Sequence, residues 1–300
     1  MSSITTRFQN IYRLQDHCFE IIGCGAIGSY TAMNLVRAGA TNFMLWDPDV
    51  VDAVNIGVQH YDLTHIGNSK VKMLRKQMLD INPLAEIFIK RQKYDNCYWS
   101  SNFYYQGYRS SRWDNFRNKK TFVICGVDSM SARKTIVENF INKYINTSVY
   151  YISDTHFIDA RMGSETFQMY QWQIMNDETS KEFLELKNKV EEENRKENEH
   201  SVTITPGNIF NRSNDGLRKF MQDILHRFDC EYDQTWYYDE DGDNEPCNAR
   251  STNYCASMAG SFINNQIRKL VDPSSPSNTN VVFNFPAMMI KCDTNYNLTK

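Results

Sequence analysis

The sequence has none of the features that would assign it to a membrane or secreted class. It contains no run of about 18 apolar residues, the length needed for a transmembrane helix. Its first residues, MSSITTRFQN, lack the apolar core of a secretion signal. We therefore expect a soluble cytoplasmic protein with reduced thiols and no membrane partner.

A strong charge imbalance and a metal-binding cysteine pattern are also missing. The formal net charge is −3, so no overall excess of basic residues points to a nucleic acid as the partner. The eight cysteines are scattered and no two occur as C-x-x-C, which argues against a structural zinc ion. A hydrophobic fraction of 41% over 300 residues is sufficient for one large α/β domain or two small ones.

The most informative feature present is a glycine-rich turn between a short apolar strand and a helix. Residues 20–22 have strand character, and residues 29–38 are predicted to form a helix that ends at Gly39. Glycines allow a turn to pass close to a phosphate, and the following helix N-terminus offers free N–H groups and a positive potential. The glycines at G-x-G-x-x-G spacing are Gly23, Gly25 and Gly28.

An acidic residue completes this pattern. A second strand is predicted over residues 42–46 and is followed by Asp47, close to the offset expected for a carboxylate that accepts ribose hydroxyls. Strand, turn, helix, strand and acid thus occur in the order of a Rossmann-like nucleotide-binding unit. The alternative is a glycine turn that joins a strand to a helix and binds no ligand.

The residues that follow the acid resemble the ThiF/MoeB/HesA adenylyltransferases, the superfamily that includes the ubiquitin-activating enzymes. In that family a second strand ends in D-x-D, and N-x-x-R-Q, I-G-x-x-K and N-P follow in order. An Asp after a later strand precedes an Arg in the next helix. The matching residues here are Asp47 and Asp49, Asn55 and Gln59, Ile66, Gly67 and Lys70, Asn82 and Pro83, and Asp128 and Arg133.

The resemblance implies a Rossmann-like α/β fold with a mixed sheet and helices on both faces. The first half of the sheet would be parallel and the second half antiparallel. We expect an N-terminal arm over residues 1–16, an ATP-binding half over 17–155 and a substrate-binding half over 156–300, in one continuous domain. Residues 176–200 are strongly charged, and we interpret them as a mobile, partly helical segment of the second half.

The activity implied by the resemblance is adenylation of a carboxylate by ATP and Mg²⁺, with pyrophosphate released. The substrate would be the C-terminus of a small ubiquitin-like or sulfur-carrier-like protein or of a peptide, and the enzyme would be a homodimer. By analogy with the family, the three glycines and Asp47 would bind the nucleotide, and Asp128 would hold Mg²⁺. Phosphates would be oriented by Asn55 and Gln59, and Lys70 would neutralise their charge.

One position departs from the family pattern. Val58 occupies the place of the arginine in N-x-x-R-Q, so a cation that would face the ATP phosphates is missing. A further arginine that the family offers across a dimer has only Arg7 or Arg13 as counterparts. Arg161 is another candidate for the missing charge, although a cross-strand ion pair is the simpler interpretation.

Two other functions remain open. A relative that has lost activity and binds nucleotide or a partner as a scaffold is consistent with Val58, and an NAD-dependent oxidoreductase is supported only by the glycines and the first acid. Some relatives use a cysteine to take the activated acyl group or sulfur. Cys230 and Cys247 are the candidates here, and a buried or incidental thiol is the simpler interpretation of each.

The remaining elements follow from periodicity and composition. We expect Asn68 to cap a helix that extends to residue 81, and residues 159–172 to form an exposed or antiparallel strand pair. Residues 92–118 are rich in aromatic and basic side chains, and we interpret them as an insertion at the domain edge rather than as a base-stacking surface. Strands are further expected over 85–89, 121–125, 148–152 and 281–291, and helices over 131–145, 214–228 and 250–270.

Overall fold

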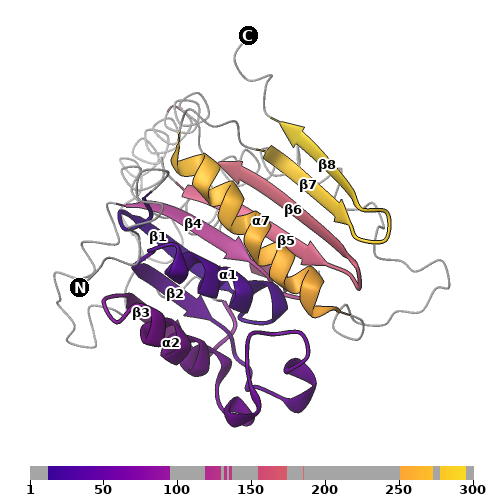
Figure 1. The fold of residues 1–300 in the computed structure, drawn as a ribbon. Coiled ribbons are helices and arrows are strands. Elements are labelled where there is room, and N and C mark those ends of the chain that lie inside the picture. The colour runs from indigo at the N-terminus through magenta and orange to yellow at the C-terminus, as the bar shows by residue number, and fades with distance from the viewer. Residues whose placement is uncertain are drawn as a thin grey trace, which may run out of the picture.

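A computed structural model describes residues 13–94, 119–129, 132–133, 135–136, 155–173, 185, 251–272 and 278–294 of the chain. Within this part of the protein, one eight-stranded sheet has the order β3-β2-β1-β4-β5-β6-β7-β8 (Figure 1). The first five strands in this order, β3, β2, β1, β4 and β5, are parallel to one another. Strands β6, β7 and β8 are each antiparallel to their neighbours. The mixed sheet predicted from the sequence is therefore confirmed. Its strands are His17–Ile22 (β1), Asn42–Trp46 (β2), Glu86–Lys90 (β3), Lys120–Cys125 (β4), Thr155–Met162 (β5), Thr166–Gln173 (β6), Asn278–Asn284 (β7) and Met289–Thr294 (β8).

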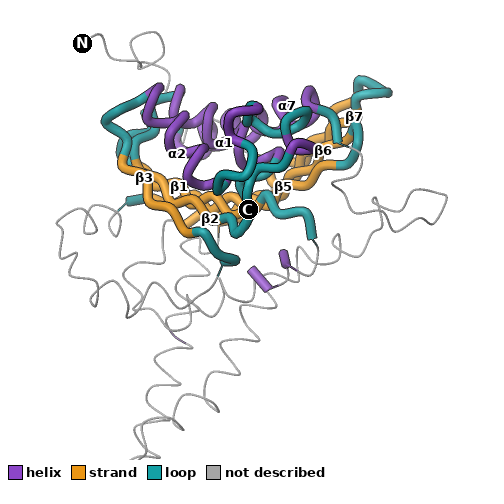
Figure 2. Tube along the Cα trace, turned by 90° about the horizontal axis from the view of Figure 1, so that it is seen from below, coloured by secondary structure: helices purple, strands orange, loops and turns teal. Residues whose placement is uncertain are grey.

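Three long helices cover one face of this sheet (Figure 2). They are Ala26–Arg37 (α1), Lys70–Ile81 (α2) and Asn253–Val271 (α7), and two 3-10 helices, Ala53–Asn55 and Leu63–His65, lie in the segment that connects β2 to α2. This segment begins at the carboxyl end of β2. Open α/β sheets bind ligands at the carboxyl ends of their parallel strands. No described helix is both long and apolar enough to cross a lipid bilayer.

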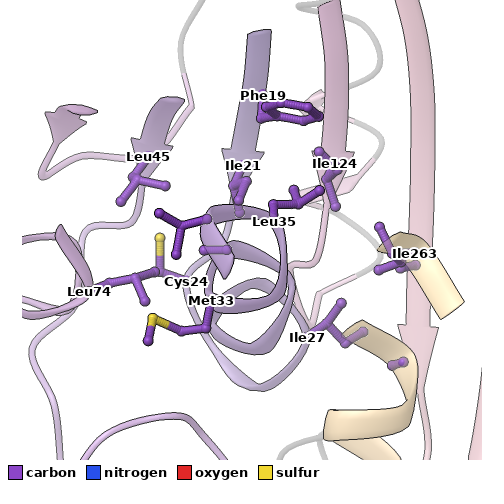
Figure 3. Close-up of a cluster of buried hydrophobic side chains, with 14 of the residues drawn as sticks. Phe19, Ile21, Cys24, Ile27, Met33, Leu35, Leu45, Leu74, Ile124 and Ile263 are labelled. Atoms are coloured by element: carbon purple, nitrogen blue, oxygen red, sulfur yellow. The ribbon is translucent and has the colours of Figure 1, made fainter. Parts of the chain in front are cut away.

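The hydrophobic core lies between the sheet and these helices. Strands β1, β2 and β4 contribute Phe19, Leu45 and Ile124, and α2 and α7 contribute Leu74 and Ile263 to the same cluster (Figure 3). The rings of Phe19 and Phe122 stack at 5.6 Å between centroids. Burial of these apolar side chains on one face fixes the register of the strands, since a shift of one residue would turn them to the other face.

Close packing of α7 on α1 depends on one glycine. A Cβ atom at Gly260 would lie 2.8 Å from Tyr30 Cβ and 2.9 Å from the Thr31 backbone nitrogen, so the two helix backbones approach more closely than any other residue would allow. Ala256 and Ala259 are fully buried on the same helix. The small side chains of α7 are thus used within the chain, and they do not point to a dimer interface.

The structure corrects several element boundaries. Helix α1 begins at Ala26 rather than at residue 29, and Ser69 rather than Asn68 is the N-cap of α2. The predicted single strand over 281–291 is wrong: β7 and β8 form a hairpin with a turn around Pro286. Proline has no N–H to donate to a strand ladder, so this residue should have signalled the turn.

The strand pair expected from residue 159 onward is confirmed as β5 and β6, but it is not exposed. Strand β5 begins at Thr155, every one of its residues is buried, and it lies parallel to β4. Its neighbour on the other side, β6, is antiparallel. Several expected segments fall outside the described residues: the strand over 148–152, the helix over 214–228, the insertion over 92–118 except residues 92–94, and the charged segment over 176–200 except Glu185.

A buried histidine lies near the amino ends of the strands. The ring of His156 on β5 stacks on Phe122 with 5.3 Å between centroids, and its Nδ1 lies 3.1 Å from the Gln171 amide nitrogen. Burial, helped by the charge of Lys120, lowers the pKa of His156 from 6.5 to about 3.

The depressed pKa of His156 predicts a loss of stability in mild acid. The unfolded chain takes up a proton on this side chain below about pH 6.5, whereas the folded chain does not until about pH 3. The unfolded state therefore binds more protons in this window, and His156 should lower the free energy of unfolding by about 2 kcal/mol between pH 7 and pH 5. Urea unfolding of the protein and of His156→Phe at both pH values measures this difference. A matched change of the partly exposed His60 to Gln should leave the pH dependence in place, and an unchanged slope in His156→Phe would contradict the prediction.

Candidate nucleotide-binding site

Three chain segments meet at the carboxyl edge of the parallel strands. The Gly23 N–H donates to the Trp46 carbonyl oxygen at 2.8 Å, and the Gly126 N–H donates to the Ile22 carbonyl oxygen at 2.9 Å. The turns that leave β1 and β4 are thereby placed side by side, next to the end of β2. This arrangement follows from the parallel pairing of β1 with both neighbours.

Two of the predicted glycines are required by packing alone. Gly23 has φ +89°, and a Cβ there would lie 3.0 Å from the Gly126 backbone. A Cβ on Gly28 would lie 1.8 Å from the Gly23 carbonyl oxygen, because Gly28 lies in the first turn of α1 rather than before the helix. Gly126 was not predicted, and it lies close to the start of α1, since a Cβ there would be 3.4 Å from the Gly28 nitrogen.

Gly25 is different, because no described atom packs against the place that its side chain would occupy. In the part of the chain that the structure describes, a Cβ at this position would meet only Gln59 Nε2, at 3.8 Å. Gly25 is the N-cap of α1, and it supplies no side-chain cap. The first helical bond runs from the Ser29 N–H to the Gly25 carbonyl oxygen, so the N–H groups of the residues between them find no acceptor among the described residues. The helix therefore presents open space and unpaired N–H groups at one point, which suits an anion.

Asp47 is buried beside this turn and holds it in place. Its Oδ2 accepts the Cys24 N–H at 2.7 Å, and its Oδ1 accepts the Asp49 N–H at 2.8 Å. Burial raises the pKa of Asp47, while the charge of Lys70 and the two N–H groups act in the opposite direction. The predicted role toward a ribose stays a prediction, and the structure adds an anchoring role that the sequence did not reveal.

Lys70 is buried at the start of α2, beside an exposed carboxylate. It is the first residue of α2, its side chain is 9% exposed, and its Nζ lies 3.2 Å from Asp49 Oδ2. The Asp49 side chain is 62% exposed, so this ion pair opens toward solvent on one side. A cation at a helix N-terminus is unfavourable unless anions compensate it. Asp47 and Asp49 supply that compensation in the protein alone.

Of the two other predicted polar residues on the segment between β2 and α2, one lies beside the glycine turn and the other is used in a local turn. Gln59 lies beside Gly25, whereas the Asn55 side chain accepts the Asp52 N–H at 2.8 Å as part of a capping box. Val58, at the position of the family arginine, packs against the hydrophobic core. The backbone of His60 donates to Ser29 Oγ at 3.0 Å and fastens the segment to α1.

Asp128 lies on the turn that follows β4, and it is exposed to solvent. Arg133 links this turn to β5: it donates to the Val127 carbonyl oxygen on the turn, and to the Ala160 carbonyl oxygen and the Asp159 carboxylate on the strand. Arg161 donates to the same carboxylate at 3.0 Å. Both arginines are buried, and the ion pair of Arg161 with Asp159 lies within strand β5.

The described thiols on β1, β4 and α7 are buried. Burial raises the pKa of Cys18, Cys125 and Cys255 to about 12, so these thiols are not nucleophiles at neutral pH. Cys230 and Cys247 lie outside the described residues. No group of three or more His, Cys, Asp or Glu side chains suited to a metal ion occurs among the residues that the structure describes.

Comparison with known proteins gives one family over nearly the whole chain. The model of the ThiF family matches residues 5–294. A tRNA threonylcarbamoyladenosine dehydratase of Bacillus subtilis (strain 168) is 31% identical over 87 residues, which are 29% of this chain and 34% of that protein. A ubiquitin-like modifier-activating enzyme 5 of Branchiostoma floridae is 35% identical over 77 residues, which are 26% of this chain and 19% of that protein. The matched segments thus span about a third or less of these curated relatives.

Solved structures show the same fold. The selenomethionine form of PaaA superposes with a TM-score of 0.55 at 14% identity, over 97% of this chain and 68% of that one. Escherichia coli MccB in a crystal structure with ATP gives a TM-score of 0.52 at 12% identity, over 95% of this chain and 65% of that one. At these identities the likeness concerns the arrangement of the elements.

Proposed function

Because the chain belongs to the ThiF family, whose adenylyltransferase members activate carboxylates, we propose that it is an ATP-dependent adenylyltransferase. Its substrate would be the C-terminal carboxylate of a small ubiquitin-like or sulfur-carrier-like protein or of a peptide. MccB has been crystallised together with MccA, and several relatives are ubiquitin-like modifier-activating enzymes, which supports a substrate of this class. We further propose a cytoplasmic homodimer, in line with the family.

The observation that carries this proposal is the start of α1. Among the described residues, a side chain at Gly25 would meet no atom closer than 3.8 Å, and the helix N-terminus has no side-chain cap. Packing explains the other two glycines and does not explain this one. A phosphate group bound against the backbone supplies the missing reason, because only glycine leaves room for it.

In the proposed reaction, an oxygen of the substrate carboxylate attacks the α-phosphorus of ATP. A new P–O bond forms, the bond to the β-phosphate oxygen breaks, and pyrophosphate leaves with that electron pair. No proton has to be removed from a carboxylate, so the protein contributes position and charge. Lys70 would neutralise negative charge on the phosphates in exchange for Asp49, and Gln59 would orient them.

Magnesium fits the donor set that the chain offers. Mg²⁺ is usually held by one or two carboxylates together with phosphate oxygens and water, rather than by a cage of protein ligands. Asp128 is a single exposed carboxylate on a turn beside the glycines, which suits this mode. The bound ion would neutralise phosphate charge.

A second candidate function is a scaffold of the same fold that binds nucleotide or a partner without turnover. It is favoured by Val58, which turns toward the core instead of offering a cation to the phosphates. Arg161 does not replace that charge, since its guanidinium is paired with Asp159 inside the protein.

Nucleotide binding is the first test of the proposal. We expect ATP with Mg²⁺ at about 100 times its Kd to stabilise the protein by about 2.7 kcal/mol in a thermal unfolding experiment, and NAD to have no effect. Gly25→Val should retain the melting temperature of the unliganded protein and lose the shift with ATP, because its side chain occupies the phosphate space. Stabilisation by NAD alone would support the oxidoreductase alternative, and no shift with any nucleotide would refute the proposal.

A further inference from the structure

Tyr61 belongs to none of the motifs, yet its hydroxyl touches the glycine turn. The side chain comes from the segment between β2 and α2 and is 6% exposed, with its ring in the hydrophobic core. Its hydroxyl donates to the Cys24 carbonyl oxygen at 2.8 Å and lies 3.4 Å from the Lys70 carbonyl oxygen. One buried group therefore bridges the start of α1 and the start of α2.

These contacts close a ring around the turn. The Cys24 N–H donates to Asp47, whose other carboxylate oxygen accepts the Asp49 N–H. The Lys70 N–H in turn donates to the Asp49 carbonyl oxygen at 3.1 Å, and the Tyr61 hydroxyl leads back to Cys24. Cys24 is held on both sides, at its N–H by a carboxylate and at its carbonyl oxygen by a phenol.

The direction of the Cys24 carbonyl determines what the next residue presents. A trans peptide is planar, and its C=O and N–H bonds point in opposite directions. When the Cys24 carbonyl oxygen points to Tyr61 in the core, the N–H of Gly25 must point away from the core. This N–H has no acceptor among the described residues, and it lies at the one glycine that packing does not explain.

We propose that Tyr61 is a positioning residue for nucleotide phosphate, acting through the orientation of the Cys24–Gly25 peptide. The inference rests on the proposed function, and it assigns a role to a side chain that touches no substrate. Without the hydroxyl, the buried Cys24 carbonyl loses its partner and the peptide plane is free to rotate. The Gly25 N–H and the unpaired N–H groups at the start of α1 are then not oriented in advance. Part of the binding free energy of the phosphate is spent on orienting them.

The test compares Tyr61→Phe with Tyr94→Phe, a second tyrosine that is also 6% exposed and whose ring packs on Trp46 instead. Isothermal titration with ATP and Mg²⁺ and with adenosine separates phosphate binding from the rest of the nucleotide. We expect Tyr61→Phe to raise the Kd for ATP about tenfold and to leave the Kd for adenosine unchanged. Tyr94→Phe should change neither value.

Each outcome decides between the claims. Equal loss of ATP and adenosine affinity would show a general structural defect and overturn the inference, as would unchanged ATP binding in Tyr61→Phe. If the unsubstituted protein binds neither compound, the proposed function fails and the inference with it. Tyr61→Leu also lacks the hydroxyl and serves as the second variant should Tyr61→Phe not fold; the same separation between ATP and adenosine is expected.

Discussion

Replacing Lys70 with methionine should slow ATP–pyrophosphate exchange by a factor on the order of 10²–10³, the cost of removing one preorganised charge from a phosphate site. The methionine side chain fills much of the volume of the buried lysine stem, so the change removes charge with little change in packing. Asp49 loses its partner but is 62% exposed, so water solvates it. The buried Asp47 loses a nearby positive charge but keeps the N–H groups of Cys24 and Asp49, so the fold should be little affected. The rate is measured with peptides and ubiquitin-like proteins that end in a free carboxylate.

Lys72 provides a matched control for this experiment. It lies two residues further along α2 and is exposed to solvent. Lys72→Met should change the exchange rate by less than about twofold, because an exposed charge is screened by water. Similar losses in both variants would mean that only the total charge of the region matters, and a normal rate in Lys70→Met would remove Lys70 from the site.

Gly28→Ala is expected to destabilise the protein by about 3 kcal/mol or more. The added Cβ would lie 1.8 Å from the Gly23 carbonyl oxygen and 2.9 Å from the Gly23 carbonyl carbon. These are backbone atoms, held by the bond from the Gly23 N–H to Trp46, and they cannot rotate away as a flexible side chain would. Overpacking of a well-packed interior commonly costs about 1–3 kcal/mol, and a clash with backbone lies at the upper end of that range. The free energy of unfolding in urea measures the loss.

A glycine in open space gives the comparison for that measurement. A Cβ at Gly57 would meet no atom within 4 Å, so Gly57→Ala should change the free energy of unfolding by no more than about 0.5 kcal/mol. If Gly28→Ala is as stable as Gly57→Ala, the first turn of α1 does not pack on Gly23 as described. Gly25→Ala should resemble Gly57→Ala in stability, which separates the packing glycines from the one that we propose to face the phosphate.

Much of the sheet could be predicted because its signals are local. Residues 42–46 and 121–125 are apolar runs typical of strands buried in a parallel sheet, and both appear as β2 and β4 with nearly those bounds. The helix predicted over residues 250–270 is α7, and Gly39, with φ +88°, lies just beyond the end of α1 as expected for a helix terminator. The prediction failed at the β7–β8 hairpin, where Pro286 and the turn around it interrupt two apolar segments.

The sequence by itself determined the order of strand, glycine turn, helix, strand and acid, and the family, because each of these signals is a residue type at a set spacing along the chain. The sequence also singled out Lys70 as a candidate, because its I-G-x-x-K pattern lies at the start of a helix. Only the tertiary structure decided which glycines are required by packing and which one borders open space. It also showed that Val58 packs against the core and that Arg161 pairs with Asp159. It alone revealed Tyr61 and Gly126. Their roles depend on contacts between segments far apart in sequence, at Cys24 and at α1, and residue patterns do not encode such distances.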